Sequence, residues 1–175
     1  MAAVAAGAVS GVRVALLSVL LGVAGLGAIV GVATTAGPPD GYARFSSSGV
    51  HLYRPTTLEV VSSGGSEVVL NARGPAGAVR VVSEPAMRGR TLSATGRTAL
   101  TAAGGGRVVR DESHDVTGAD AAREVVAEDA QGHVRRTAVV AQRDNRVYVL
   151  TVSVRRGTPS SVLDAQTVVD SFYLT

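Results

Sequence analysis

A short polar segment near the middle of the chain contains the residue types that could do chemistry. Glu112, His114 and Asp115 lie within four consecutive positions, and a carboxylate beside an imidazole can exchange a proton or bind a metal ion. A zinc site needs three or four converging ligands, and His51 and His133 are isolated from this segment in the sequence. The spacing therefore favours a solvated loop, with an enzymatic or metal-binding site around Glu112, His114 and Asp115 as the alternative.

Serine-rich and glycine-rich segments offer no better catalytic site. The runs at 46–48 and 62–66 lack the Gly-x-Ser-x-Gly pattern that presents a nucleophilic serine. The glycines at 104–106 follow an expected helix instead of opening one, so the helix dipole would not favour a phosphate there. The chain has no cysteine, which excludes disulfides, thiolate metal ligands and a cysteine nucleophile. The sequence therefore assigns no catalytic, cofactor-binding or metal-binding residue, and it predicts neither an enzyme nor a cofactor.

The composition is that of a folded, weakly basic chain. Of its 175 residues, 46% are hydrophobic, and 17 basic residues, all arginine, against 14 acidic residues give a net charge of +3. A nucleic-acid-binding surface needs a basic stripe, which the sequence lacks, and 3% aromatic residues leave no platform for stacking bases. Arg88, Arg90, Arg97, Arg135 and Arg136 could face an anion or a lipid surface, but the acids interleaved with them favour ordinary solvated faces.

An uncharged segment near the N-terminus matches the thickness of a membrane. Residues 14–36 carry no charge over 23 positions, between Arg13 and a proline pair at 38–39. As a helix they would extend roughly 34 Å, enough for a hydrocarbon core of about 30 Å. Cleavage after Ala36 would make the segment a signal peptide, but its apolar run exceeds the usual length of about 7–15 residues. We therefore expect a membrane anchor, with a secreted form cleaved near Ala36 as the alternative.

This segment defines the expected organisation of the chain. The tail of small residues that precedes the span is too short to carry the protein's function. We therefore expect the first span to export the domain that follows it. Within the span, Gly27 and Gly31 form a small-xxx-small pair that lets two helices approach closely, and we expect at most a weak dimer from it. The expected parts are a tail (1–13), a transmembrane signal anchor (14–36), a linker (37–41) and an extracytoplasmic domain (42–175).

Alternating and β-branched segments in the domain predict a sheet built from hairpins. In the segment 146–155, both odd and even positions carry apolar or small side chains. This pattern is typical of a central strand that is covered on both faces. Asp144-Asn145 supplies the turn from the preceding strand. The other segments expected as strands are 50–53, 67–72, 78–83, 107–110, 122–128 and 133–142.

Two helices complete the predicted elements. The first covers 91–103 and ends at the glycine run 104–106. The second begins at Thr158-Pro159, an N-cap followed by a proline at the first helical position, and covers 160–170. Strands clustered in hairpins, with helices in the middle and at the end, indicate an α+β fold. The buried face of the second helix is expected to carry Val162, Ala165, Val169 and Phe172.

Motifs in the domain resemble those of a known superfamily. The segment 143–152 is a charged turn followed by Val-Tyr-x-Leu-Thr, and 169–174 has Ser-Phe before a last strand. Upstream, 49–55 matches an early strand of the pattern Gly-hydrophobic-x-hydrophobic-x-x-Pro. Over most of residues 41–175, these motifs resemble the Mog1/PsbP-like superfamily, which includes actinobacterial envelope proteins of the mycobacterial LpqN type.

The resemblance implies a fold and a role. The fold is an α/β/α sandwich with helices flanking a central, mostly antiparallel sheet, and the role is non-enzymatic binding or assembly. Thr57-Leu58 stands where the family often has an aromatic residue, and the membrane span replaces the lipidated cysteine of LpqN-type proteins. The expected protein is a membrane-tethered, extracytoplasmic binding or assembly module of the cell envelope. Its expected partner is another envelope protein or a lipid component, not a nucleic acid.

Overall fold

The computed structural model describes residues 37–65 and 67–175 of the chain. The predicted tail (1–13) and the predicted membrane span (14–36), with its glycines at 27 and 31, lie outside the described residues. Within the described ranges, no helix is long and apolar enough to cross a membrane.

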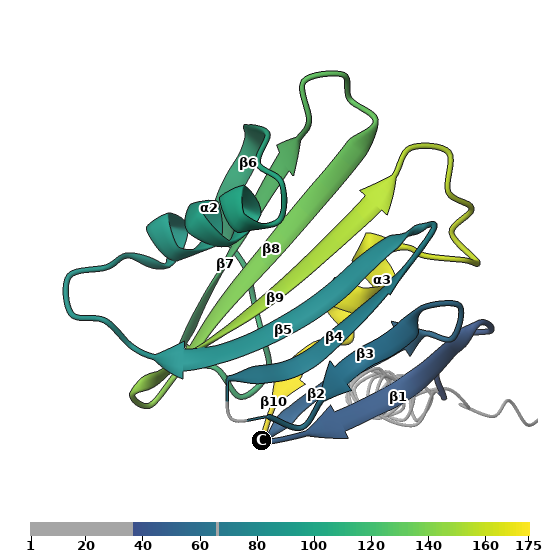
Figure 1. Cartoon of the computed structure of the whole chain (residues 1–175). Coiled ribbons are helices and arrows are strands. Elements are labelled where there is room, and N and C mark those ends of the chain that lie inside the picture. The colour runs from purple at the N-terminus through teal and green to yellow at the C-terminus, as the bar shows by residue number, and fades with distance from the viewer. Residues whose placement is uncertain (1–36, 66) are drawn as a thin grey trace, which may run out of the picture. The chain divides into compact units, whose positions relative to one another are not determined.

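In the described part of the chain, seven antiparallel strands form the main sheet (Figure 1). They are β3 (Glu59–Ser63), β4 (Val68–Gly74), β5 (Gly77–Pro85), β6 (Arg107–Ser113), β7 (Ala121–Glu128), β8 (Val134–Arg143) and β9 (Arg146–Arg155). The spatial order is β3-β4-β5-β9-β8-β7-β6, so β9 pairs with β5 on one side and β8 on the other. The prediction that this strand is central is confirmed.

A second, three-stranded antiparallel sheet brings the two ends of the described domain together. Its strands are β1 (Tyr42–Ser47), β2 (Val50–Pro55) and β10 (Tyr173–Leu174), with β2 in the middle. The sequence predicts β2 but neither β1 nor β3, because the serines at 46–47 and 62–63 favour turns. In the structure these serines end the two strands. The turn from β1 to β2 is at Ser48-Gly49, and both residues have a positive φ.

Two helices and the second sheet cover the main sheet. The first helix, α2 (Leu92–Ala102), packs on β7, β8 and β9. The opposite face packs against the second helix, α3 (Ala165–Asp170), and against core residues of the three-stranded sheet. As predicted, the main sheet therefore has a helix on each face. The sequence did not predict the second sheet, whose strand β2 adds Val50 and Leu52 to the core on the second face.

The first helix begins and ends where the sequence predicts. The hydroxyl oxygen of Thr91 accepts a hydrogen bond of 3.2 Å from the backbone N–H three residues later, as an N-cap does. At the other end, the N–H of Gly105 donates to the carbonyl of Leu100 (2.8 Å). Gly96 lies so close to β7 that an added Cβ would be 2.8 Å from Val125 Cγ2. Glycine is therefore required there for the helix to approach the sheet.

The second helix begins later than the sequence predicts. Thr158-Pro159 does not open it; α3 begins after Asp164, whose carboxylate accepts hydrogen bonds from two backbone N–H groups of the first turn (3.0 and 3.3 Å). The cause is the hydroxyl of Tyr42. It accepts a hydrogen bond from the N–H of Asp164 (2.7 Å) and donates one to the carbonyl of Ser160 (3.1 Å). In a continuous helix these two backbone groups would bond to each other, so the inserted hydroxyl separates one turn from the helix that follows.

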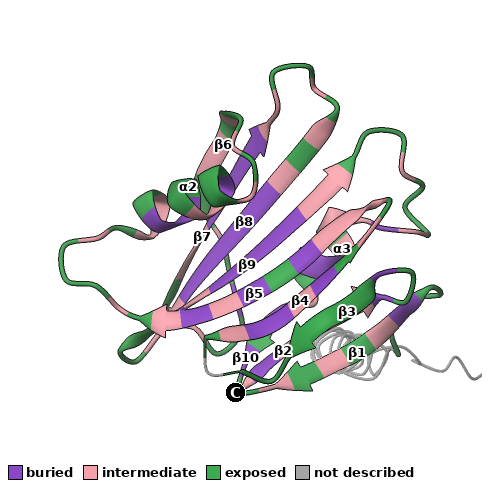
Figure 2. Ribbon diagram, in the orientation of Figure 1, coloured by how far each residue is buried: buried purple, intermediate pink, exposed green. Residues whose placement is uncertain are grey.

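The largest cluster of buried side chains lies between the main sheet and the layer of α3 and the second sheet (Figure 2). Phe172 is 3% exposed, which confirms its predicted place in the core. Val169 is buried as expected, but Val162 and Ala165 are only half-buried. Leu163 is buried in their place, because the interruption before Asp164 changes which side chains face the sheet.

Candidate functional site

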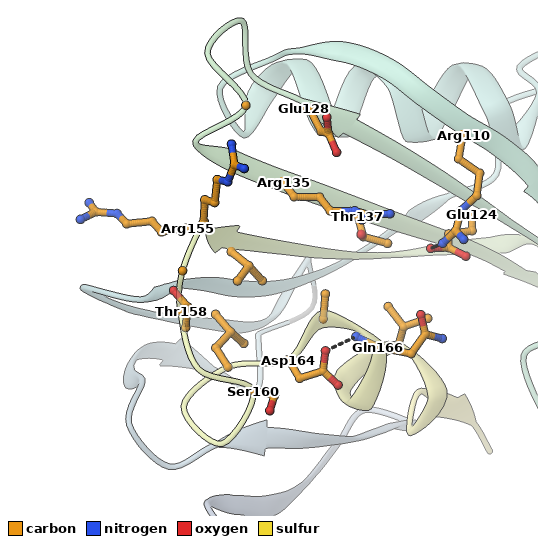
Figure 3. A pocket seen from close by; sticks show the side chains of 17 residues that line it. Arg110, Glu124, Glu128, Arg135, Thr137, Arg155, Thr158, Ser160, Asp164 and Gln166 are labelled. Atoms are coloured by element: carbon orange, nitrogen blue, oxygen red, sulfur yellow. Dashed lines mark hydrogen bonds and ion pairs between the residues drawn. The ribbon is translucent and has the colours of Figure 1, made fainter.

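A groove lies between the main sheet and the segment that leads into α3 (Figure 3). Its volume is about 620 Å³, within the range of roughly 300–1,000 Å³ that is usual for small-molecule sites. Strands β7, β8 and β9 supply its floor, and residues 156–169 supply the facing wall. Figure 3 shows Glu128, Arg135 and Thr137 on the sheet side and Thr158, Ser160 and Asp164 on the facing segment.

Strand alternation determines which side chains form the floor. Glu128, Arg135 and Val154 are directly opposite one another in β7, β8 and β9, so their side chains form one row on the same face. Thr137 follows Arg135 by two residues and therefore shares that face. Because all four residues belong to paired strands, the floor is positioned by the backbone of the sheet.

Backbone and side-chain hydrogen bonds fix the wall at both ends. The N–H of Arg155 donates to the carbonyl of Ala76 (3.0 Å), and that of Arg156 donates to the carbonyl of His133 (2.7 Å). At the other end, the Tyr42 hydroxyl bonds to the segment 160–164 from β1. Burial raises the pKa of Tyr42, so the hydroxyl keeps the proton that it donates. The groove is thus bounded by segments that are preorganised.

The charged residues of the groove divide into those with partners and those without. Glu124 is 4% exposed and forms an ion pair with Arg110 at 2.5 Å. Asp164 caps α3. Among the described residues, no side-chain hydrogen bond or ion pair engages the other charged residues in the lining. These are Glu128, Arg135, Arg155 and Arg156, so the unengaged charges are three cations and one anion.

Thr137 is the buried polar residue of the floor. It is 4% exposed and lines the groove, and within the described part of the chain its hydroxyl forms no hydrogen bond. The hydroxyl oxygen is not among the buried side-chain atoms that lack a hydrogen-bond partner, so it is the edge of the side chain that solvent in the groove reaches. Thr137 therefore offers the groove one polar group on an otherwise buried side chain.

The predicted polar cluster is only partly brought together. Glu112 lies opposite Glu124 at the outer edge of the sheet, and its carboxylate is 3.3 Å from Nε of Arg110. Nδ1 of His114 lies 3.8 Å from the Glu124 carboxylate, and Asp115 is exposed. Among the described residues, no group of three or more side chains is placed to bind a metal ion. In the structure, Arg110 is the partner of the Glu112 and Glu124 carboxylates.

A second charged cluster lies where α2 meets the edge of the sheet. Asp111 accepts hydrogen bonds from the Ser93 hydroxyl (2.6 Å), Arg97 (2.8 Å) and Arg123 (2.5 Å). The Ser93 hydroxyl, followed by the two guanidinium groups, lowers the pKa of Asp111 to about 2. Arg136, on the same side of the sheet, donates to two carbonyls at the end of α2. Arg97, through Asp111, and Arg136, through the two carbonyls, therefore hold the helix in place, whereas Arg135 lines the groove.

Sequence reasoning missed most of the groove. No sequence motif singles out five of its lining residues, because they come from four strands and a loop. These residues are Arg110, Glu124, Thr137, Arg155 and Arg156. Two signals do mark them in the sequence. Glu124 and Thr137 are polar residues beside the apolar runs 125–127 and 138–141, and the paired arginines precede a glycine where β9 ends.

Comparisons with known proteins bear on the fold. The chain matches no known family of sequences and no curated protein. Its structure is similar to that of PsbP from the cyanobacterium Synechocystis (CyanoP), with a TM-score of 0.54 and 17% identity, over 77% of this chain and 93% of that one. A protein from Bacteroides thetaiotaomicron gives a TM-score of 0.43 at 10% identity, over 78% of this chain and 48% of that one. The described domain has a PsbP-like fold.

Proposed function

We propose that this chain is a single-pass membrane protein whose PsbP-like domain binds another component outside the cytoplasm and performs no catalysis. The observation that carries the proposal is the groove: a concave site on a preorganised sheet, with cationic side chains that no described residue engages. Binding sites are usually concave and preformed, with a few polar groups that orient the occupant. The chain would then act in the cell envelope in the manner of the LpqN-type proteins that its motifs resemble.

The roles of Glu124 and Asp164 support binding over catalysis. The Glu124 carboxylate is neutralised by Arg110, and the Asp164 carboxylate is occupied by the N–H groups that open α3. A general base must instead present a carboxylate or imidazole with a free lone pair to the reacting atom. Glu112 and His114 lie at the edge of the sheet and outside the lining of the groove, so a ligand there would not contact them.

The membrane tether rests on residues 14–36 and can be tested by labelling. Because the chain has no cysteine, Ala102→Cys on exposed α2 and Ala5→Cys in the tail each create a single reactive site. In intact cells, a membrane-impermeant maleimide should label Ala102→Cys and should label Ala5→Cys only after lysis. Labelling in the opposite order, or a mature chain that begins near Gly37 in the medium, contradicts the proposal.

Binding by the groove can be tested without knowledge of the partner. A photo-crosslinking amino acid at Ser160, in the lining of the groove, should yield an adduct of increased mass when intact cells are irradiated. The matched control carries the same amino acid at Ser46, an exposed residue of β1. An adduct at Ser160 alone supports a groove partner. No adduct, or the same adduct at both positions, contradicts one.

A further inference from the structure

The edge strand β3 has an outer side that nothing in the described fold covers. It lies at one end of the strand order and pairs with β4 alone. All five of its residues are exposed (Figure 2). The backbone groups on its outer side form no hydrogen bond with any described residue. An edge of this kind is a template for another extended strand.

Two adjacent valines make this edge apolar. Val60 is 40% exposed and Val61 is 55% exposed. The register of β3 with β4 shifts between Val60 and Ser62, so Val61 is the extra residue of a β-bulge. β-Branched residues stabilise paired strands through their contacts across the pair. A strand added to β3 would therefore gain backbone hydrogen bonds and cover apolar surface that is open in the described fold.

The opposite edge of the main sheet, β6, is protected by charge. It also has a bulge with an exposed valine, Val109 (42%). Four of its seven residues are charged, however, and ion pairs within the chain hold Arg110, Asp111 and Glu112. Charged side chains are a common protection of edge strands against pairing. In β3, Glu59 is the only charged residue, so β3 is the edge that is open to another strand.

The position of Glu59 fits pairing of β3 with the same strand of a second copy of this chain. Identical surfaces meet in a dimer with a two-fold axis. When two antiparallel copies of one strand pair about their middle, the first residue of each faces the last residue of the other. Glu59 begins β3, so the two carboxylates lie at opposite ends of the pair and like charges do not face each other. In β6 the middle residue is Arg110, so the same pairing would bring two arginines together.

We propose that β3 pairs antiparallel with β3 of a second copy, so that the two main sheets join edge to edge through Val60 and Val61. This interaction surface goes beyond the proposed function, because neither valine lines the groove. A ladder between two five-residue strands is short, and a single pair of strands is only marginally stable in water. The dimer is therefore weak, and a covalent link between the copies is the suitable way to detect it.

Chemical cross-linking of the purified full chain, at high concentration in a zwitterionic detergent, tests the proposal. The chain has no cysteine, so Val61→Cys and Val109→Cys each introduce a single thiol. Each replaces the exposed valine at the bulge of one edge strand, which makes the second variant a matched control. A short bismaleimide joins two thiols that face each other. Val61→Cys should give at least about fivefold more linked dimer than Val109→Cys.

A second substitution, combined with Val61→Cys, locates the contact on the strand. Val60→Lys places a charge on the open edge and should reduce the linked dimer to the level of Val109→Cys. Because Val60 is exposed, the melting temperature should stay within about 3 °C of that of Val61→Cys alone. Val109→Lys, combined with Val61→Cys in the same way, adds the same charge to the opposite edge and should leave the linked dimer unchanged.

The glycine pair in the predicted span offers another route to a dimer, and a last variant separates the two. Gly27→Ile with Gly31→Ile blocks close approach of two spans and should leave the linked dimer of Val61→Cys unchanged. Equal linking of the two single-cysteine chains, no linked dimer with Val61→Cys, a dimer that resists Val60→Lys, or a dimer lost in the glycine variant overturns the proposal. None of these results bears on the groove, whose adduct in intact cells tests the proposed function separately.

Discussion

The hydroxyl of Tyr42 links the first strand of the domain to the wall of the groove, and its removal has a calculable cost. Tyr42→Phe keeps the buried ring, which is 8% exposed. It removes two hydrogen bonds, one from the N–H of Asp164 and one to the carbonyl of Ser160. At about 1 kcal/mol for each bond, the free energy of unfolding should fall by about 2 kcal/mol. For a domain of this size, that corresponds to a melting temperature lower by roughly 6 °C.

Thermal unfolding of the full chain in detergent, followed by tyrosine circular dichroism in the near ultraviolet, measures this change. Tyr173→Phe is the matched control. No described residue bonds to the Tyr173 hydroxyl, and its ring stacks on His51 at 4.5 Å, a contact that phenylalanine retains. Exchange of the Asp164 amide hydrogen should also be faster in Tyr42→Phe. If Tyr42→Phe has the same melting temperature as Tyr173→Phe, and if the exchange rate of the Asp164 amide hydrogen is unchanged, the hydroxyl does not determine where α3 begins.

The same hydroxyl gives the protein a defined response to alkaline pH. Because burial raises the pKa of Tyr42 in the folded state, the unfolded chain loses this proton first. Stability is therefore complete below about pH 10 and falls as the pH rises from there towards the folded pKa. The chain has no lysine, so no lysine titration obscures this range. The fall should be smaller in Tyr42→Phe than in the unmodified chain.

Three further predictions concern single side chains. Phe172→Ala should lower the free energy of unfolding by about 3–5 kcal/mol, the usual cost of emptying a buried aromatic site; an unchanged melting curve with lost binding would make Phe172 a contact residue instead. Thr137→Val should leave it within about 0.5 kcal/mol, since the hydroxyl bonds to no described residue and is not a buried unpartnered atom, and a clearly lower melting temperature would contradict this. Asp111 has a pKa of about 2 in the folded state. Its contribution to the free energy of unfolding is therefore complete above about pH 4 and is lost as the pH falls towards 2. Asp111→Asn should therefore be less stable than the unmodified chain at pH 7, and it should lose less stability than that chain between pH 4 and pH 2. An equal loss of stability in the two proteins over this range would contradict the assigned pKa.

The elements that the sequence predicts well are those defined by their own residues. Strand β9 carries apolar residues on both faces, α2 has Thr91 before it and glycines after it, and Phe172 lies in an apolar pattern. The start of α3 could not be predicted in the same way. It depends on a hydroxyl that is 122 positions from Asp164 in the sequence, and no local pattern reveals such a contact.

The groove was beyond prediction for a related reason. The polar cluster at 112–115 is compact in the sequence, but in the structure Glu112 pairs with Arg110, His114 lies beside Glu124, and β6 ends at Ser113, before Asp115. Arg135, Thr137 and Arg156 are far less conspicuous in the sequence. They line the same groove because β8 pairs with β9 and because the loop after β9 returns over the sheet.

Occupation of the groove in the native membrane can be measured most directly by chemical modification of arginine. Phenylglyoxal reacts with accessible guanidinium groups, and mass spectrometry reports the extent at each residue. Arg135, Arg155 and Arg156 should react more slowly in native membranes than in the purified chain, because the ligand covers them. Three exposed arginines outside the groove, Arg44, Arg73 and Arg80, should react equally in both. Equal reactivity of all six arginines in the two preparations would contradict a binding function for the groove.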